Sequence, residues 1–294
     1  MSGGSLGLGY QAVILAAGRG SRLHEYTHEM PKSILPIGPR SRSDESPTNF
    51  LRRQSEVLVD LGIEDIVIVV GFLKEAIFAE AERWDLPVRF VVNTASDIST
   101  SGSLHSFQFA VRSSHGVLDG RKQTLLMDAD ILYHRGALRK LLQAPEPSAL
   151  LVTENYRPGD EAVLVYGTAG RPRFLGKGLS APLVADEPCL GEAVGIVKFA
   201  ASDHALARET MDWMVGDPDA PGNTPRHRGF APARRGTEHE ELTQRFMHYR
   251  KMRCVMVGHD LPFMECDDAG DYSEIRDSFY PRLLAAEASD GDAA

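Results

Sequence analysis

The chain has 294 residues, of which 43% are hydrophobic, and its formal net charge is −9. This acidic balance excludes a protein that coats nucleic acid or an anionic membrane, and no stretch reaches the roughly 20 apolar residues of a membrane span. The three cysteines are too few and too scattered for a disulfide framework or a zinc site, so we expect a cytoplasmic protein.

Strands and helices alternate through the first half of the sequence. Short apolar runs bounded by turn residues predict buried strands, and apolar positions spaced three and four apart predict helices between them. Such alternation is typical of an α/β fold with a mostly parallel sheet covered by helices on both faces. The predicted strands are 12–17, 65–72, 88–93 and 123–130, and the predicted helices are 49–62, 74–85, 103–114 and 135–144.

From about residue 150 the strands become shorter and turn signals more frequent, with one helix expected near 201–215. This half is therefore predicted to be mixed α/β. We expect a single domain over 11–284, in which a first half (11–150) is followed by a smaller second half (151–284). The remaining predictions are a flexible leader at 1–10, an exposed loop at 38–49, a mobile loop or lid at 217–239 and a flexible tail at 285–294.

A glycine-rich turn follows the first strand in "AAGRGSRL". Glycines allow backbone N–H groups to approach an anion closely, and two nearby cations, Arg22 and Lys32, are suited to neutralising phosphates. The turn alone is equally consistent with an ordinary strand-to-helix connection that carries surface Arg and Lys. It matches neither the dinucleotide fingerprint nor the Walker A loop.

The "PKSILPI" segment that follows the turn favours the interpretation as a phosphate site. The composite Ala-Ala-Gly-x-Gly-Ser-Arg-Leu and Pro-Lys-x-x-Leu-Pro resembles the N-terminal signature of the sugar-phosphate nucleotidyltransferase superfamily, whose fold is a Rossmann-like mixed sheet flanked by helices. The resemblance implies that Arg22 holds the pyrophosphate leaving group and that Lys32 reaches toward the reacting phosphate. It also implies that base and phosphates lie against Leu15, Ala16, Ala17, Gly18, Gly20 and Ser21.

Acidic residues at the ends of two predicted strands suit a magnesium ion, which prefers carboxylate oxygens. Asp128 and Asp130 alternate at the carboxyl end of a buried strand, and one of them is alternatively explained as a helix cap. The resemblance selects Asp130 as ligand and catalytic residue and leaves Asp128 in a supporting role. The segment "FMECDDAGDY" resembles an element of the choline-phosphate and phosphonate cytidylyltransferase branch, which implies that Glu265 and Asp267 complete the Mg²⁺ site.

Base and acceptor residues are expected on either side of these carboxylates. Asn93, Ser101 and Ser103 are similar to a family stretch that recognises the base, and hydroxyls there are equally suited to capping a helix. Cytosine is the preferred base. By resemblance, the acceptor site is expected to include Glu192, Lys198 and Glu240, although Glu192 is equally well explained as a solvated carboxylate at a strand end.

The predicted function is an Mg²⁺-dependent cytidylyl transfer from CTP to a small acceptor that is phosphocholine-like, aminoethylphosphonate-like or a polyol phosphate. The acceptor oxygen attacks the α-phosphorus directly and pyrophosphate leaves, so positioning and charge neutralisation supply the catalysis. Two alternatives stay open: a sugar-1-phosphate or cyclitol-phosphate nucleotidyltransferase using UTP, GTP or dTTP, and a nucleotide-binding regulatory domain without turnover. No nucleic-acid partner and no membrane insertion are expected. The protein is expected to form a homodimer. The ten histidines are interpreted as surface or core residues.

Overall fold

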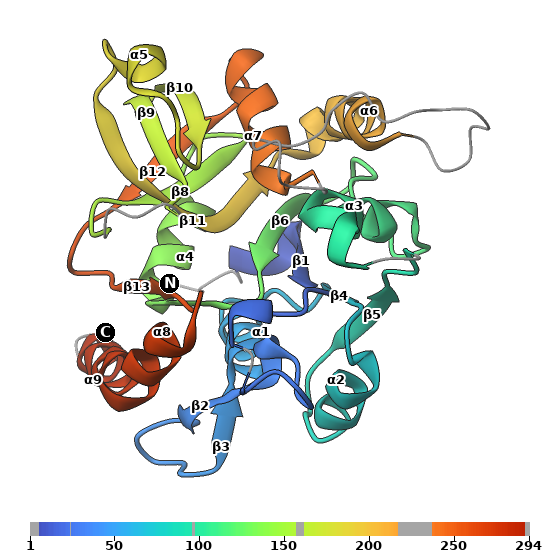
Figure 1. Cartoon of the computed structure of the whole chain (residues 1–294), viewed down its shortest axis with the longest axis vertical. Coiled ribbons are helices and arrows are strands. Elements are labelled where there is room, and N and C mark those ends of the chain that lie inside the picture. The colour runs from blue at the N-terminus through green and yellow to red at the C-terminus, as the bar shows by residue number, and fades with distance from the viewer. Residues whose placement is uncertain (1–5, 24, 96–97, 157–161, 217–236, 292–294) are drawn as a thin grey trace.

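The computed structural model describes residues 6–23, 25–95, 98–156, 162–216 and 237–291 (Figure 1). A nine-stranded sheet lies at the centre, and its main path runs β10-β9-β11-β6-β1-β4-β5, with β8 pairing to β11 and β12 pairing to β8. The strands are β1 (Tyr10–Ala16), β4 (Ile66–Val70), β5 (Val88–Val92), β6 (Gln123–Asp128), β8 (Ala149–Thr153), β9 (Leu164–Thr168), β10 (Arg171–Gly176), β11 (Cys189–Phe199) and β12 (Arg253–Val257).

Within the central sheet β1, β4, β5 and β6 are all parallel, and β12 is parallel to β8. The long strand β11 runs antiparallel to β6, β8 and β9, and so joins the second half to the first. The mixed, mostly parallel sheet predicted from the sequence is confirmed. Because β1, β4 and β6 are parallel, their carboxyl ends meet at one edge, where open α/β sheets collect ligands.

Helices cover both faces of this sheet (Figure 1). Apolar side chains alternate along the strands, so that one face packs on α1, α2 and α4, and the other on α3, α6 and α7. The helices are α1 (Phe50–Asp60), α2 (Lys74–Ala81), α3 (Ile98–Arg112), α4 (Arg135–Gln143), α5 (Ala181–Val184), α6 (His204–Val215), α7 (His239–His248), α8 (Ala269–Glu274) and α9 (Tyr280–Gly291), with 3-10 turns at Leu6–Gly9, Ser21–Leu23, Lys32–Ile34 and Ala201–Asp203 and a π-helical turn at Ile275–Phe279.

Two short antiparallel pairs complete the fold. β2 (Pro36–Pro39) pairs with β3 (Pro47–Asn49), so the predicted loop at 38–49 is a hairpin with an exposed tip. β7 (Ile131–Tyr133) pairs with β13 (Phe263–Glu265), which draws the end of the chain back to the carboxyl end of β6. This second pair determines the position of the acidic segment that contains Glu265 and Asp267.

The prediction of a flexible tail at 285–294 is wrong for residues 285–291. They continue α9, and the carboxylate of Glu287 is buried there against Arg53, with Nη2–Oε distances of 2.8 Å. The leader prediction is also wrong beyond residue 5, because Leu6–Gly9 form a 3-10 turn in which Gly7 is buried against Gly62. Residues 217–236, which make up most of the predicted lid, lie outside the described residues.

Candidate active site

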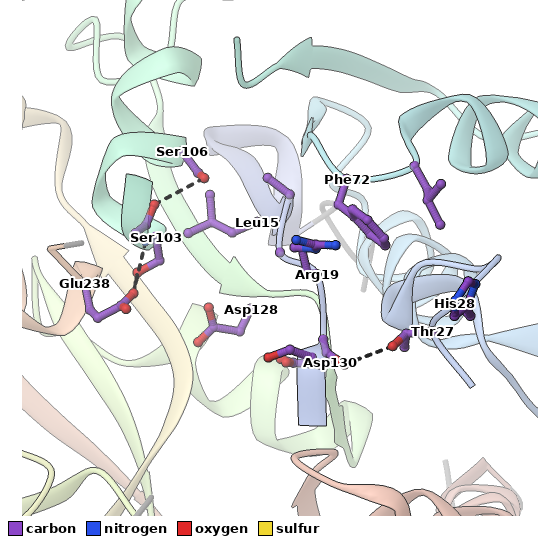
Figure 2. A pocket seen from close by; sticks show the side chains of 16 residues that line it. Leu15, Arg19, Thr27, His28, Phe72, Ser103, Ser106, Asp128, Asp130 and Glu238 are labelled. Atoms are coloured by element: carbon purple, nitrogen blue, oxygen red, sulfur yellow. Dashed lines mark hydrogen bonds between the residues drawn. The ribbon is translucent and has the colours of Figure 1, made fainter. Parts of the chain in front are cut away.

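Three adjoining cavities open where β1, β4 and β6 end. The first, of about 800 Å³, lies over the glycine-rich turn and is also lined by Phe72, Ser103 and Asp128 (Figure 2). A connecting cavity of about 340 Å³ shares Gly20 and Asp130 with it. A second large cavity, of about 780 Å³, shares Arg22, Glu265 and Asp267 with the connecting one. A two-substrate reaction has a place for each substrate here, with the carboxylates between them.

The glycine-rich turn lies as the sequence predicts. Leu15, Ala17, Gly18, Gly20 and Ser21 line the first cavity, while Ala16 lines the connecting one. Gly20 adopts a φ of +59°, and a Cβ there would lie 2.9 Å from Cβ of Lys32. A residue without a side chain is therefore required for the lysine to pass beneath the turn.

Both predicted cations are bound to predicted carboxylates. Nζ of Lys32 lies 2.6 Å from Oδ2 of Asp130, and Nη2 of Arg22 lies 2.7 Å from Oδ1 of Asp267. The lysine is buried, which alone would lower its pKa, but the adjacent carboxylate of Asp130 outweighs burial and raises it. Lys32 is therefore held as a charged ammonium.

The pairing of β13 with β7 brings the second acidic cluster to the first. Glu265 stands opposite Ile131, and the N–H of Cys266 donates to the carbonyl of Asp130 at 3.0 Å. Glu265 and Asp267 consequently line the same connecting cavity as Asp130, as the resemblance implied.

The crowded carboxylates leave excess negative charge at this point. Burial, followed by the neighbouring charges of Asp130, Asp267 and Asp128, raises the pKa of Glu265 well above its usual range. Burial also raises the pKa of Asp267, in spite of Arg22. Hard oxygen donors of this kind fit Mg²⁺. Within the described part of the chain no three His, Cys, Asp or Glu side chains are already grouped as a metal site. Lys32 and Arg22 are paired with two of the carboxylates.

A histidine that the sequence analysis passed over completes this region. Nε2 of His239, at the start of α7, lies 3.0 and 3.1 Å from the two carboxylate oxygens of Asp128. Burial by itself disfavours a charged ring, but the carboxylates of Asp128 and Glu240 outweigh it and raise the pKa of His239 to about 10. "TEHEEL" has no spacing that marks this histidine, so only the fold reveals the contact.

The residues predicted for the base differ in placement. Ser103 lines the first cavity, where its hydroxyl and N–H both bond to Oε2 of Glu238 at 2.6 and 3.0 Å (Figure 2). Asn93 is buried behind the wall, where its amide donates to Oγ of Ser106, which lines the cavity. The side chain of Ser101 lies outside the described residues.

Of the predicted acceptor residues, Glu192 lines the second large cavity and Glu240 the connecting one. The prediction for Lys198 is wrong. Its side chain is buried, and its ammonium donates to the carbonyls of Leu141 and Ala144 at the end of α4, at 3.1 and 3.0 Å. A lysine committed to closing a helix end is not available to an acceptor.

Lys177, unlike Lys198, lies close to the predicted acceptor residues. It follows β10 between two glycines and lines the connecting cavity, close enough to Glu192 and Asp267 to influence the pKa of both carboxylates. The signal in the sequence is the segment "GKG", in which glycines on both sides of the lysine allow the backbone to approach an anion closely. None of the described helices is both long and apolar enough to cross a bilayer.

Comparison with known proteins identifies the family of the chain. The family model for the MobA-like NTP transferase domain matches residues 12–194. The CMP-5'-(3-aminopropyl)phosphonate synthase of Streptomyces rubellomurinus is 33% identical over 150 residues, which are 50% of this chain and 21% of that protein. The choline-phosphate cytidylyltransferase of Streptococcus pneumoniae is 36% identical over 83 residues, 28% of this chain and 32% of that protein.

Among solved structures, the inositol-1-phosphate CTP transferase of T. maritima superposes with a TM-score of 0.65 at 15% sequence identity, covering 94% of this chain and 95% of the other. The likeness shows that the two proteins share a fold. The chain spans only about a fifth to a third of the length of these two relatives from Streptomyces and Streptococcus.

Proposed function

Because the chain belongs to the family of MobA-like NTP transferase domains, whose model matches more than half of its residues, we propose that it is an Mg²⁺-dependent cytidylyltransferase. In this proposal it transfers CMP from CTP to a small phosphate or phosphonate acceptor and releases pyrophosphate. The observation that carries the proposal is the connecting cavity between the two larger ones, where Arg22 and Lys32 lie beside carboxylates from distant parts of the chain.

The first cavity suits the nucleotide. Its glycine-rich turn allows backbone N–H groups to approach phosphates closely, and Arg22 and Lys32 line the adjoining connecting cavity as counter-charges. Cytosine is supported by the CMP-5'-(3-aminopropyl)phosphonate synthase and the choline-phosphate cytidylyltransferase, which share sequence with part of this chain.

The second large cavity suits a cationic acceptor. Its acidic side chains outnumber the basic ones, and the aromatic rings of Tyr156, Phe263 and Phe279 line it as well. A small molecule that carries an amine at one end and a phosphonate or phosphate at the other would place the amine among the carboxylates. The acidic residues of this wall are Glu192, Asp260, Glu265, Asp267, Asp268, Asp271 and Glu274.

In the proposed reaction, an oxygen of the acceptor's phosphonate or phosphate attacks the α-phosphorus of CTP. The bond from that phosphorus to the bridging oxygen breaks, and pyrophosphate leaves with the electron pair. Lys32 and Arg22 hold the reacting and departing phosphates, and Lys177 is placed to hold the acceptor's anionic group. Asp130, Glu265 and Asp267 would hold Mg²⁺, which offsets negative charge on the phosphates when bound.

Pyrophosphate release tests the proposal directly. CTP, UTP, GTP and dTTP are each combined with aminoethylphosphonate, phosphocholine, glycerol phosphate and sugar 1-phosphates. We expect release with CTP and an amine-bearing acceptor, and its loss in Asp130→Ala but not in Asp44→Ala at the exposed hairpin tip. Release only with a sugar phosphate would contradict the proposed acceptor, and activity that survives Asp130→Ala would contradict the proposed metal site.

A homodimer and a cytoplasmic location remain predictions from the sequence.

A further inference from the structure

The side of the first cavity formed by α3 and the start of α7 carries three polar groups, which are the hydroxyls of Ser103 and Ser106 and the carboxylate of Glu238 (Figure 2). Because Arg22 and Lys32 line the adjoining connecting cavity, a triphosphate bound there leaves the first cavity to the ribose and the base. The three polar groups are therefore placed to recognise the base.

Glu238 is held in place by the starts of two helical segments. Gly102, with a φ of +65°, breaks α3, so that a new helical segment begins at Ser103, whose N–H donates to Oε2 of Glu238 at 3.0 Å. Glu238 is also the N-cap of α7, where its side chain accepts from the N–H of Glu241. A carboxylate is favourable at each of these positions, because the first N–H groups of a helix have no partner within the helix.

The hydroxyl hydrogen of Ser103 is committed to this carboxylate. Oγ of Ser103 donates to Oε2 of Glu238 at 2.6 Å, and an ionised carboxylate can only accept. The same Oγ accepts from the N–H of His239 at 2.8 Å. A hydroxyl oxygen has two lone pairs, so one of them remains. Toward a ligand in the cavity, Ser103 is therefore an acceptor and not a donor.

Ser106 has the same polarity. Nδ2 of Asn93 donates to its Oγ at 3.0 Å, and the N–H of Ala95 donates to Oδ1 of Asn93 at 2.9 Å, which determines the end of the amide that faces the serine. The hydroxyl of Ser106 donates to the carbonyl of Gly102 at 3.4 Å. Both serines therefore present a lone pair to the first cavity.

This polarity distinguishes the pyrimidine bases. Cytosine carries an amino group, which donates, at the ring position where uracil and thymine carry a carbonyl oxygen, which accepts. A wall of acceptors can bond to the amino group, whereas a carbonyl oxygen against it would leave both sides unpaired. Sites that bond to a polar group of a substrate discriminate strongly for this reason.

We propose that Glu238 is a positioning residue for the choice of base: by accepting the hydroxyl hydrogen of Ser103, it makes that serine an acceptor for the amino group of cytosine, so that CTP is preferred to UTP. The inference rests on the proposed function and gives its nucleotide preference a physical cause. It assigns the contact with the base to Ser103, and Glu238 acts through that serine.

Two substitutions and their combination test the proposal. The amide of Glu238→Gln can donate to Oγ of Ser103, which releases the hydroxyl hydrogen for the carbonyl of uracil. This variant should lower the ratio of CTP to UTP affinity about tenfold, the effect of one hydrogen bond. Ser103→Ala should also lower the ratio, by weakening CTP and leaving UTP nearly unchanged. The double variant should match Ser103→Ala, because Glu238 then has no serine to orient.

Affinities for CTP and UTP are measured by isothermal titration calorimetry on the full chain with Mg²⁺ and without an acceptor, and folding by circular dichroism. Glu241→Gln is the matched control, because it removes the same charge from the first turn of α7, where the carboxylate accepts from the N–H of Glu238. It should leave the ratio unchanged. A similar shift in this control would overturn the proposal, as would an unchanged ratio in Glu238→Gln or in Ser103→Ala.

A Glu238→Gln effect that persists in the Ser103→Ala background would also overturn it, because Glu238 would then act on the base without the serine. If Glu238→Gln fails to fold, Ser103→Ala still decides: a loss of CTP affinity alone supports an acceptor serine, and a loss for UTP or equal losses for both nucleotides contradict it. A chain that shows the expected affinities but releases no pyrophosphate would refute the proposed function alone. A chain that transfers CMP with the same ratio in both variants would refute this inference alone.

Discussion

Glu192 is a carboxyl group whose protonation changes close to neutral pH. Burial, and then the nearby carboxylate of Asp267, raise its pKa to about 7 from an ordinary value of 4.5. The folded protein therefore keeps a proton that the unfolded chain has released between these two values. Stability must fall as pH rises through that window, because the folded state binds more protons there.

Replacing this group by its neutral analogue reveals the effect. Glu192→Gln should match the unmodified protein in free energy of unfolding below about pH 4.5 and exceed it above about pH 7, on the order of 1 kcal/mol once solvent screening of a partly exposed group is included. Urea denaturation at pH 4, 6 and 8 measures the difference. The exposed Glu209→Gln should show no such pH dependence, and a constant difference for Glu192→Gln would refute the assignment.

At the scale of single residues, the sequence is informative where a role has a linear pattern. Arg22, Lys32 and Asp130 stand in segments whose pattern resembles the family's, and the structure brings them together. His239 and Lys198 have no such pattern. A histidine at a helix start and a lysine in a strand acquire their partners only when distant elements pack against them, so the first was overlooked and the second misassigned.

Among the helices, α4 depends on a side chain from the sheet beneath it. Lys198 projects from β11, and its ammonium bonds to two carbonyls in the last turn of α4 and just beyond it. Burial lowers the pKa of this lysine, because a charged ammonium loses its hydration there. The two carbonyl oxygens replace part of that hydration by accepting hydrogen bonds from the ammonium. The role of Lys198 is therefore to stabilise the end of α4.

Lys198→Met should therefore reduce stability without affecting catalysis. Two buried carbonyls lose a charged donor, for which we expect a loss of about 1–3 kcal/mol in free energy of unfolding. Lys177→Met should do the reverse: little change in stability and a KM for the acceptor raised at least about tenfold, since one good charge contact is worth about 1.5 kcal/mol or more. Denaturation and steady-state kinetics on both variants separate the two roles. An increase of acceptor KM in Lys198→Met would restore the original prediction.

Elements in the first half were predictable because each combines a clear period with a clear end. α1, for instance, begins after Asn49, whose side chain accepts from the N–H of Arg52, and it ends beside Gly62 at a φ of +84°. The hairpin of β2 and β3 was missed because its tip is polar and its strands are three to four residues long. Tertiary contacts maintain it: the hydroxyls of Tyr272 and Tyr280 donate to the carbonyls of Pro36 and Pro39.

For the molecule as a whole, α9 holds α1 and α4 together through the buried carboxylate of Glu287, an arrangement that we call the lock. Glu287 receives two hydrogen bonds from Arg53 on α1 and one from the N–H of Arg135 on α4, and it is only 2% exposed. The three helices are thereby joined around one buried charge. Nothing in "LLAAEASDGDAA" marks that glutamate, which is why a frayed end was predicted.

Breaking this lock should weaken the whole fold. Glu287→Gln leaves Arg53 buried without its counter-charge, and we expect a loss of about 3–5 kcal/mol. Replacing both Arg53 and Glu287 by Met removes both charges and should recover much of that loss. The exposed pair of Arg83 and Glu80 is the control, for which Arg83→Ala should cost about 1 kcal/mol or less. A small effect of Glu287→Gln in urea denaturation would contradict the lock.

The short ladder between β7 and β13 also has a consequence for protein synthesis. It joins Glu265 to the strand that follows Asp130, although the glycine-rich turn and both cations leave the ribosome more than 200 residues earlier. The half of the site with the two cations is translated first, and Glu265 and Asp267 follow more than 200 residues later. A ribosome that stalls before residue 263 thus releases a chain with both cations of the site and without two of its carboxylates.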